Sequence, residues 1–141
     1  MMRSAALLCA VELLVAVAAL DDSTIRTAVA EWLSDSAAAE AAYGHISTWE
    51  TGEVTDMSDL FCAASAYTNC NTAAASFNED IGAWDTSGVT GMSAMFNEAS
   101  SFNQDLNNWR VDKVTDMSWM FAHTSSFNQD LSNALGRPHG R

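Results

Sequence analysis

Apolar side chains return at fixed intervals along the second half of the chain. The blocks FNEDI, FNQDL and FNQDL each begin 25 residues after the previous one, and tryptophan, valine, methionine and phenylalanine follow in the same phase. No single copy can bury these residues alone, so the copies are expected to stack and share one elongated core. The recurring apolar positions are Phe77, Phe102 and Phe127; Ile81, Leu106 and Leu131; Trp84 and Trp109; Val89 and Val114; Met92 and Met117; Met95 and Met120; Phe96 and Phe121.

An earlier copy falls into the same register once an insertion is allowed. Phe61 lies 35 residues before Phe96, ten more than the period. We therefore place three repeats at residues 46–131, with the insertion at 62–76. The insertion contains Cys62 and Cys70, and a disulfide between them would close the bulge. The residues that define this copy are Ile46, Trp49, Val54, Thr55, Met57, Ser58, Leu60 and Phe61.

Each repeat contains two local patterns. Over residues 90–99 the apolar side chains fall at i, i+3, i+4 and i+7, which predicts a short helix that Thr90 can cap. The segment at residues 81–86 is too short and too rich in turn residues for a helix, so Ile81 and Trp84 are interpreted as inward residues of a brief strand or turn. We expect an α/β repeat solenoid with short parallel strands about 4.8 Å apart on one side and short helices on the other.

The segment at residues 21–45 has a different pattern and is interpreted as an N-terminal capping helix with a lead-in. Asp22 or Ser23 can cap its start. An amphipathic helix of this kind can cover the exposed end of a repeat core, and we prefer that role to partner binding. The residues that share its apolar face are Ile25, Val29, Trp32 and Leu33.

The repeat pattern stops abruptly near the C-terminus. The next tryptophan phase falls on Ala134, and residues 132–141 form an irregular tail without an amphipathic face. An uncapped last coil, with Leu131 stacked at an open edge, favours self-association or association with another chain.

Residues 1–20 have the pattern of a secretory signal peptide. Arg3 supplies a positive start, an apolar run follows, and small residues at 16–19 provide a cleavage site. Glu12 interrupts the run, which is too short for a membrane span of ~20 apolar residues. The alternative is an ordinary buried helix. We expect a secreted or cell-surface protein without a membrane span.

Cys9 would be removed with the signal peptide, which leaves Cys62 and Cys70. These two cysteines and the net charge agree with an exported, soluble protein. Cys62 and Cys70 favour a disulfide over a metal site, because no CxxC motif or histidine pair accompanies them. Eighteen acidic against six basic residues give a formal net charge of −12. This charge repels phosphate backbones, so nucleic-acid binding is disfavoured. It is interpreted as a solvated surface.

Two in-phase side-chain rows have candidate roles. Asn78, Asn103 and Asn128 are expected to form a structural ladder that hydrogen-bonds the backbone of each turn. The tryptophans are interpreted as core. If they were exposed, they would form a binding ladder for sugar rings or a protein partner. The tryptophan row is Trp49, Trp84 and Trp109.

A third row consists of Asp80, Asp105 and Asp130. Stacked carboxylates can bind Ca²⁺ between coils, because this ion accepts oxygen ligands in flexible geometry. The alternative is that each aspartate accepts backbone N–H bonds in its own turn, and this interpretation is favoured.

No catalytic residues, cofactor or resident metal are predicted: the three histidines lie in unrelated phases, and no nucleophile motif or phosphate loop is present.

The run FNQDL…W…VTDMSWMF resembles the repeat of the BspA-like leucine-rich-repeat surface proteins, over roughly residues 46–131. The segment YGHISTWET is similar to the lead-in of that family. The resemblance implies a leucine-rich-repeat-like fold and a secreted or cell-surface location, with adhesion in some members. It brings no shared catalytic residues.

These observations predict a non-catalytic binding or adhesion scaffold outside the cell, with an extracellular protein or glycan as partner. A calcium-dependent extracellular module with aspartate sites between repeats is the alternative. A hydrolytic enzyme is the third reading, and a stack of three coils leaves little room for its cleft.

Overall fold

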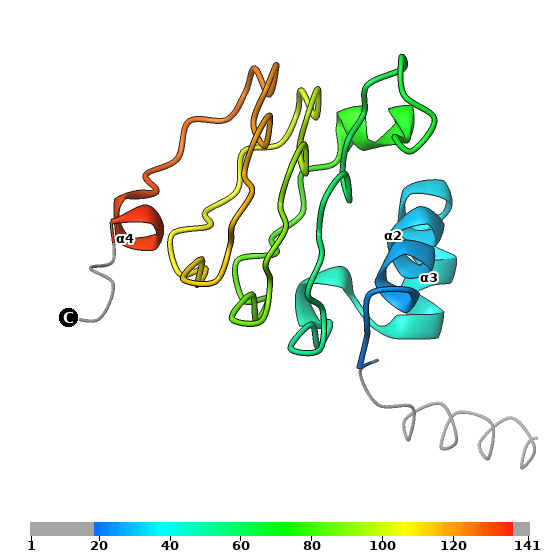
Figure 1. The fold of residues 1–141 in the computed structure, drawn as a ribbon. Coiled ribbons are helices and arrows are strands. Elements are labelled where there is room, and N and C mark those ends of the chain that lie inside the picture. The colour runs from blue at the N-terminus through cyan, green and yellow to red at the C-terminus, as the bar shows by residue number, and fades with distance from the viewer. Residues whose placement is uncertain (1–18, 137–141) are drawn as a thin grey trace, which may run out of the picture.

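The computed structural model describes residues 19–136, which form a stack of coils closed at one end by helices (Figure 1). Helices α2 (Thr24–Ser34) and α3 (Ser36–Tyr43) come first, and the coils follow side by side. Short 3-10 segments lie at η1 (Ile46–Thr48) and η2 (Thr72–Ser76), and the one-turn helix α4 (Ser132–Leu135) lies beside the last coil. The predicted signal peptide falls outside the described residues, apart from Ala19 and Leu20.

The predicted N-terminal helix is divided in two at Asp35. This residue has extended backbone (φ −155°), and its side chain accepts a hydrogen bond from the backbone N–H of Ala38 at 3.1 Å. An aspartate side chain competes with the helix for backbone donors and so ends one helix while starting the next. The apolar face of α2 is buried as expected, with Ile25, Val29 and Trp32 at most 6% exposed.

The predicted α/β solenoid of leucine-rich-repeat type is wrong. Within residues 19–136 the coils contain no β-strand and no sheet, only isolated parallel bridges at Ala19–Glu50, Asp56–Gly91 and Gly91–Asp116. The helix predicted over residues 90–99 is a succession of turns. Neighbouring coils are nevertheless joined by regular backbone hydrogen bonds.

The backbone N–H groups of the second coil alternate between two destinations, and this explains both failures. Those of Ala94, Phe96 and Glu98 donate to carbonyls of the third coil at 2.8 to 2.9 Å, whereas those of Met95 and Asn97 close turns within their own coil. A helix uses all of these donors inside one segment, and a sheet directs them between segments. Because the coil divides them, neither regular element forms.

Columns of stacked phenylalanine rings run through the core. Each ring lies over its counterpart one repeat away, and the two columns touch within each coil at centroid distances of 4.1 to 4.4 Å. The repeat spacing thus places identical rings in contact, which is the packing that the sequence period predicts. The columns are Phe61, Phe96 and Phe121, with spacings of 5.7 and 5.6 Å, and Phe77, Phe102 and Phe127, with spacings of 5.9 and 6.0 Å.

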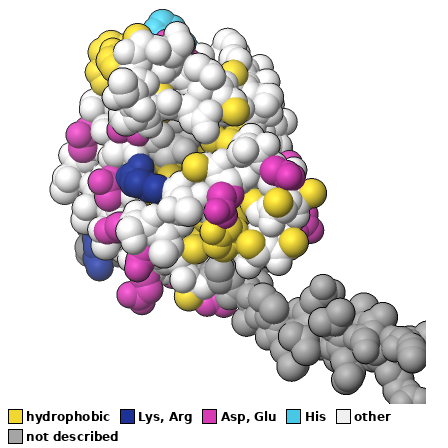
Figure 2. Space-filling model, turned by 90° about the vertical axis from the view of Figure 1, so that its right-hand side faces the viewer, with side chains coloured by type: hydrophobic (Ala, Val, Ile, Leu, Met, Phe, Trp, Pro, Cys, Tyr) yellow, Lys and Arg dark blue, Asp and Glu magenta, His cyan; other side chains and the backbone are white. Residues whose placement is uncertain are grey.

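The N-terminal helix closes the first coil through charged side chains as well as apolar contacts. Arg26 donates to the carbonyl oxygens of Ser58 and Asp56 at 2.8 and 3.1 Å. Asp22 accepts from the backbone N–H groups of Thr55 and Asp56 at 2.6 and 3.1 Å. Figure 2 looks onto this end of the stack, where acidic side chains are spread over the surface.

Candidate functional site

The three tryptophans of the predicted ladder lie in the core. Trp49, Trp84 and Trp109 are 2 to 3% exposed. The indole N–H of Trp84 donates to the carbonyl of Ile46 at 2.8 Å, and that of Trp109 donates to the carbonyl of Ile81 at 3.0 Å. These rings therefore join consecutive coils and do not form an exposed ladder.

The asparagine row links consecutive coils. The side-chain oxygen of Asn78 accepts from the backbone N–H of Asn103 at 2.9 Å, and Asn103 accepts from Asn128 at the same distance. Gln104 and Gln129 donate to the same side-chain oxygens, at 3.1 and 3.0 Å. The side-chain oxygens of Asn78 and Asn103 are thus bonded within the protein.

Each aspartate of the candidate calcium row accepts a bond inside its own turn, which is the interpretation that the sequence favours. Asp80 accepts from the backbone N–H of Gly82 at 2.9 Å. Asp105 and Asp130 accept from the residues two positions later, at 2.8 Å in both cases. This is the local turn geometry typical of aspartate.

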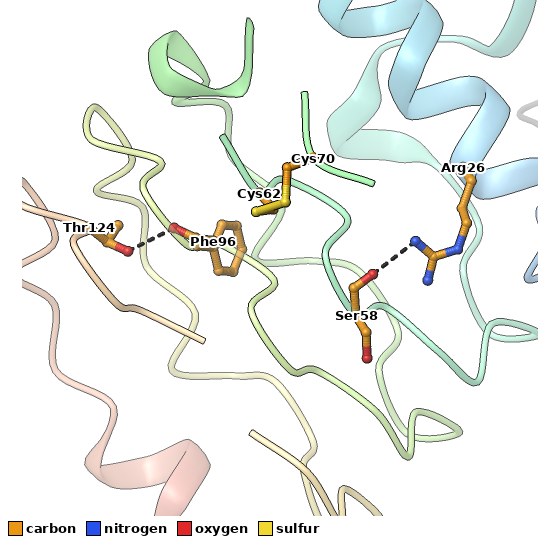
Figure 3. The surroundings of a disulfide bond; sticks show 6 residues. All are labelled: Arg26, Ser58, Cys62, Cys70, Phe96 and Thr124. Atoms are coloured by element: carbon orange, nitrogen blue, oxygen red, sulfur yellow. Dashed lines mark hydrogen bonds between the residues drawn. A yellow bond between two sulfur atoms is a disulfide. The ribbon is translucent and has the colours of Figure 1, made fainter. Parts of the chain in front are cut away.

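Cys62 and Cys70 are joined by a disulfide, with their Cα atoms 4.8 Å apart (Figure 3). The bond closes the base of the inserted loop, where the backbone N–H of Asn71 also donates to the carbonyl of Cys62 at 2.8 Å. The Asp59 carboxylate lies within 4.8 Å of both cysteine sulfurs. Because the sulfurs are bonded to each other, they are not available as thiolate metal ligands.

A polar hollow of about 250 Å³ lies beside this loop and extends over the edges of all three coils. Tyr67 and Asn69 border it from the inserted loop, between the two cysteines. We call it the polar hollow, and it is lined by Asp59, Tyr67, Asn69, Ala94, Asn97, Glu98, Trp119 and His123.

One side-chain atom of a residue that lines the polar hollow lacks a partner within residues 19–136. The side-chain oxygen of Asn97 is buried and accepts no hydrogen bond, although the residue is only 7% exposed. A buried polar atom without a partner costs roughly 1 to 3 kcal/mol. The backbone N–H and carbonyl of Asn97, by contrast, bond to Ala94 and Ala63. A hydrogen-bond donor that reached this oxygen from the polar hollow would remove that cost.

Exposed aromatic rings and acidic groups complete the polar hollow. Trp119 and Tyr67 are 68% and 60% exposed, unlike the buried tryptophans of the core. Burial raises the pKa of Asp59 above its usual value, and a hydrogen bond from Asn69 partly offsets this effect. Glu98 adds a second carboxylate. The site therefore combines flat apolar rings with hydrogen-bond acceptors.

Left-handed backbone is concentrated in the polar hollow. Within residues 19–136, every non-glycine residue with positive φ lines it, at φ values of 54 to 62°. Such backbone costs roughly 1 to 2 kcal/mol per residue. Inter-coil hydrogen bonds offset part of this cost, because Asp59, Ala94 and Glu98 each donate to the next coil. The five left-handed residues are Asp59, Ala94, Glu98, Trp119 and His123.

Sequence reasoning missed these residues because they do not repeat. Asp59, Ala94 and Trp119 occupy one repeat position, and Ala63, Glu98 and His123 occupy another, with a different side chain each time. A search for self-similarity favours invariant positions, which here form the core. Positions at which the copies differ would have been the useful signal.

Comparison with known protein families matches residues 32–135 to the family described as "Mycoplasma protein of unknown function, DUF285". No curated protein and no solved structure matches the chain. No helix in the described part of the chain is long and apolar enough to cross a membrane. Since the family match covers well over half of the 141 residues, the chain belongs to the DUF285 family, which is of the BspA-like repeat type.

Proposed function

We propose that this chain is a non-catalytic binding module of the cell exterior, and that the polar hollow binds a neutral glycan. The unpaired side-chain oxygen of Asn97 carries the proposal, because sugar hydroxyls are the donors that it lacks. Trp119 and Tyr67 supply rings on which a sugar can stack. The disulfide supports an oxidising, extracellular setting.

Charge narrows the class of ligand. Asp59 and Glu98 line the polar hollow, and the formal net charge of the chain is −12. Sulfated or carboxylated glycans would be repelled by this potential. A lysine side chain is the competing occupant, since carboxylates and aromatic rings also attract ammonium groups. We favour the glycan because a hydroxyl satisfies the neutral amide oxygen without the desolvation of a charge.

The calcium-dependent alternative has no comparable support. Asp80, Asp105 and Asp130 each accept a bond from their own turn. Adhesion through several such modules would gain strength from multivalency, in keeping with the BspA-like repeat type.

The test is titration of the oxidised protein with neutral oligosaccharides, monitored by tryptophan fluorescence. Asn97→Ala should abolish binding without lowering the free energy of unfolding, because the lost oxygen has no partner to lose. Trp119→Ala should weaken binding at least about tenfold. Leu135→Ala, which changes a residue that is 54% exposed outside the polar hollow, is the control and should leave binding unchanged.

A lysine-rich peptide is titrated in parallel. Peptide binding that disappears with salt and with Asn97→Ala, while no oligosaccharide binds, would replace the glycan with a cationic protein as ligand. Failure of both probes in the oxidised protein would reject the polar hollow as a binding site.

A further inference from the structure

The stack of coils has a direction, which its backbone hydrogen bonds define. Every second N–H group of the first coil, from Met57 to Ala63, donates to a carbonyl of the second coil. The second coil donates to the third in the same way, from Met92 to Glu98. Each coil therefore presents acceptors to the coil before it and donors to the coil after it.

The last coil presents its donors to no described residue. The equivalent N–H groups belong to Met117, Trp119, Phe121 and His123, and none of them has a hydrogen-bond partner within residues 19–136. We call these four groups the donor edge. The carbonyl of Thr115 lies at the start of the donor edge. Its equivalent in the second coil, the carbonyl of Thr90, accepts from the backbone N–H of Thr115. Unpaired backbone groups in a row are a template for another chain.

The side chains of the last coil are incompletely covered in the same place. Val89, Met92 and Phe96 of the second coil are 0% exposed, whereas their counterparts in the third coil are only partly buried. An apolar hollow of about 480 Å³ opens there. Its lining includes Trp109, Val111, Met117, Phe121, Leu131 and Leu135.

Helix α4 covers part of this end but leaves the donor edge open. Ala134 is buried at the position where the preceding coils have tryptophan. The side-chain oxygen of Asn107 holds α4 by accepting from the backbone N–H groups of Asn133 and Ala134, at 2.8 and 3.0 Å.

A second copy of this chain does not supply the missing acceptors. The acceptor carbonyls of Asp56 and Ser58 in the first coil are occupied by Arg26. The carbonyl of Cys62, in the same row, accepts from Asn71. Two last coils placed face to face would set N–H groups against N–H groups, which is repulsive. Head-to-tail and tail-to-tail pairing are therefore both disfavoured.

We propose that the donor edge and the apolar hollow dock a coil of the same repeat type, supplied by a different polypeptide whose acceptor carbonyls are uncovered. The occupant follows from the contacts between the second and third coils, where the same donors and side chains meet such a coil. The apolar hollow takes its Met and Phe side chains, and the donor edge takes its alternate carbonyls. This site adjoins the proposed glycan site, because Trp119 lines both hollows and His123 belongs to both the donor edge and the polar hollow, whereas Asn97 lines the polar hollow alone.

The probe is the full chain with a copy of residues 107–131 joined after Arg141 by a flexible Gly/Ser linker. Tethering supplies a millimolar effective concentration, so weak docking is populated. Amide hydrogen exchange, followed residue by residue by NMR, should slow at least about tenfold at Met117, Trp119, Phe121 and His123. The intervening amides of Met120 and Ala122 already close turns and should change less.

Two controls identify the surface. A tethered copy carrying Met117→Asp and Phe121→Asp should give no protection, because its apolar side chains no longer fill the hollow. Leu135→Asp in the host chain should reduce the protection while leaving the fold intact, because Leu135 lines the apolar hollow and is 54% exposed. The Asn97→Ala variant should dock normally, which separates this proposal from the glycan site.

Absence of protection with the intact tethered copy would overturn the proposal. So would a stable dimer of the untethered chain, measured by light scattering, that protects the same four amides, because the donor edge would then pair with itself. A monomeric untethered chain that gains protection only from the intact copy is the expected result.

Discussion

The guanidinium of Arg26 lies 2.8 Å from the carbonyl oxygen of Ser58, in the position that a backbone N–H of a preceding coil would occupy (Figure 3). Its second nitrogen reaches the carbonyl of Asp56. One side chain of α2 thus replaces two backbone donors, while Asp22 supplies the acceptor for Thr55. The first coil is closed by charged side chains that reproduce the hydrogen-bond pattern of the stack.

Replacing Arg26 should therefore destabilise the protein more than replacing another exposed arginine. Arg26→Met leaves two carbonyls without a donor and should lower the free energy of unfolding by about 2 kcal/mol. Arg110→Met is the matched control, because the side chain of Arg110 forms a surface ion pair with Asp112 at 3.4 Å and donates to no backbone carbonyl within residues 19–136. That pair should contribute less than about 1 kcal/mol. Equal losses in chemical denaturation would contradict the capping role.

Acid should weaken the same cap. Hydrogen bonds from the side chain and backbone of Thr55 lower the pKa of Asp22, and bonds from Thr24 and Ser23 lower the pKa of Asp21 to about 2. A carboxylate whose pKa is depressed by folding stabilises the protein above its unfolded pKa of ~3.9 and loses this effect as the pH falls through its folded pKa. The thermal unfolding midpoint should therefore decrease as the pH is lowered past about 4.

Asp22→Asn tests the acid prediction directly. This variant keeps a side-chain acceptor but has no titrating group, so its midpoint should depend less on pH in the acid range. Circular dichroism melts from pH 2 to 7 provide the measurement. An unchanged acid slope would assign the pH dependence to other carboxylates.

The hydrogen bonds of the buried indole N–H groups should contribute to the free energy of unfolding, in addition to the packing of the rings. Trp84→Phe and Trp109→Phe keep an aromatic ring but leave the carbonyls of Ile46 and Ile81 without that donor. We expect a loss of about 1 to 3 kcal/mol in each case by urea denaturation. Trp119→Phe, at a position that is 68% exposed, should change the free energy of unfolding little.

The disulfide should stabilise both the fold and the border of the polar hollow. The double variant Cys62→Ala, Cys70→Ala frees a short loop and should lower the free energy of unfolding by roughly 2.5 kcal/mol. Tyr67 and Asn69 lie within this loop, so glycan binding should fall even at temperatures where the variant is folded. Binding that survives the loss of the bridge would remove the loop from the site.

Left-handed backbone offers a stabilising substitution. Ala94 has a φ of 54°, which glycine adopts without the steric cost that alanine meets. Ala94→Gly should therefore raise the free energy of unfolding by up to about 1 kcal/mol. Ala99→Gly is the control at a buried position without positive φ, and it should lower stability. Two losses of similar size would contradict the strain argument.

The features that the sequence predicted well are those set by repeated burial. Phenylalanine and tryptophan recur because each coil covers the next, so the 25-residue period identifies the columns of Phe61 and Phe77. The spacing of Cys62 and Cys70 within an insertion likewise predicted their bond. Such features depend on residue type and spacing alone.

The path of the backbone within each coil was not predictable in this way. The apolar spacing over residues 90–99 fits a helix, yet Ala94 and Glu98 have left-handed backbone, which intrinsic preferences disfavour. Hydrogen bonds to the next coil hold them there, and these exist only after stacking. Tertiary contacts therefore replaced both the predicted helix and the predicted strands.

The sequence by itself determined the repeat, the residues of its core and the disulfide, because burial and covalent chemistry select particular side chains at particular spacings. The tertiary structure decided which side chains meet at the polar hollow and which backbone groups stay open at the last coil. Asn97, Trp119 and Tyr67 come together only because unlike residues of stacked coils and an inserted loop share one edge. The direction of the donor edge likewise arises from hydrogen bonds between coils, which residue spacing does not encode.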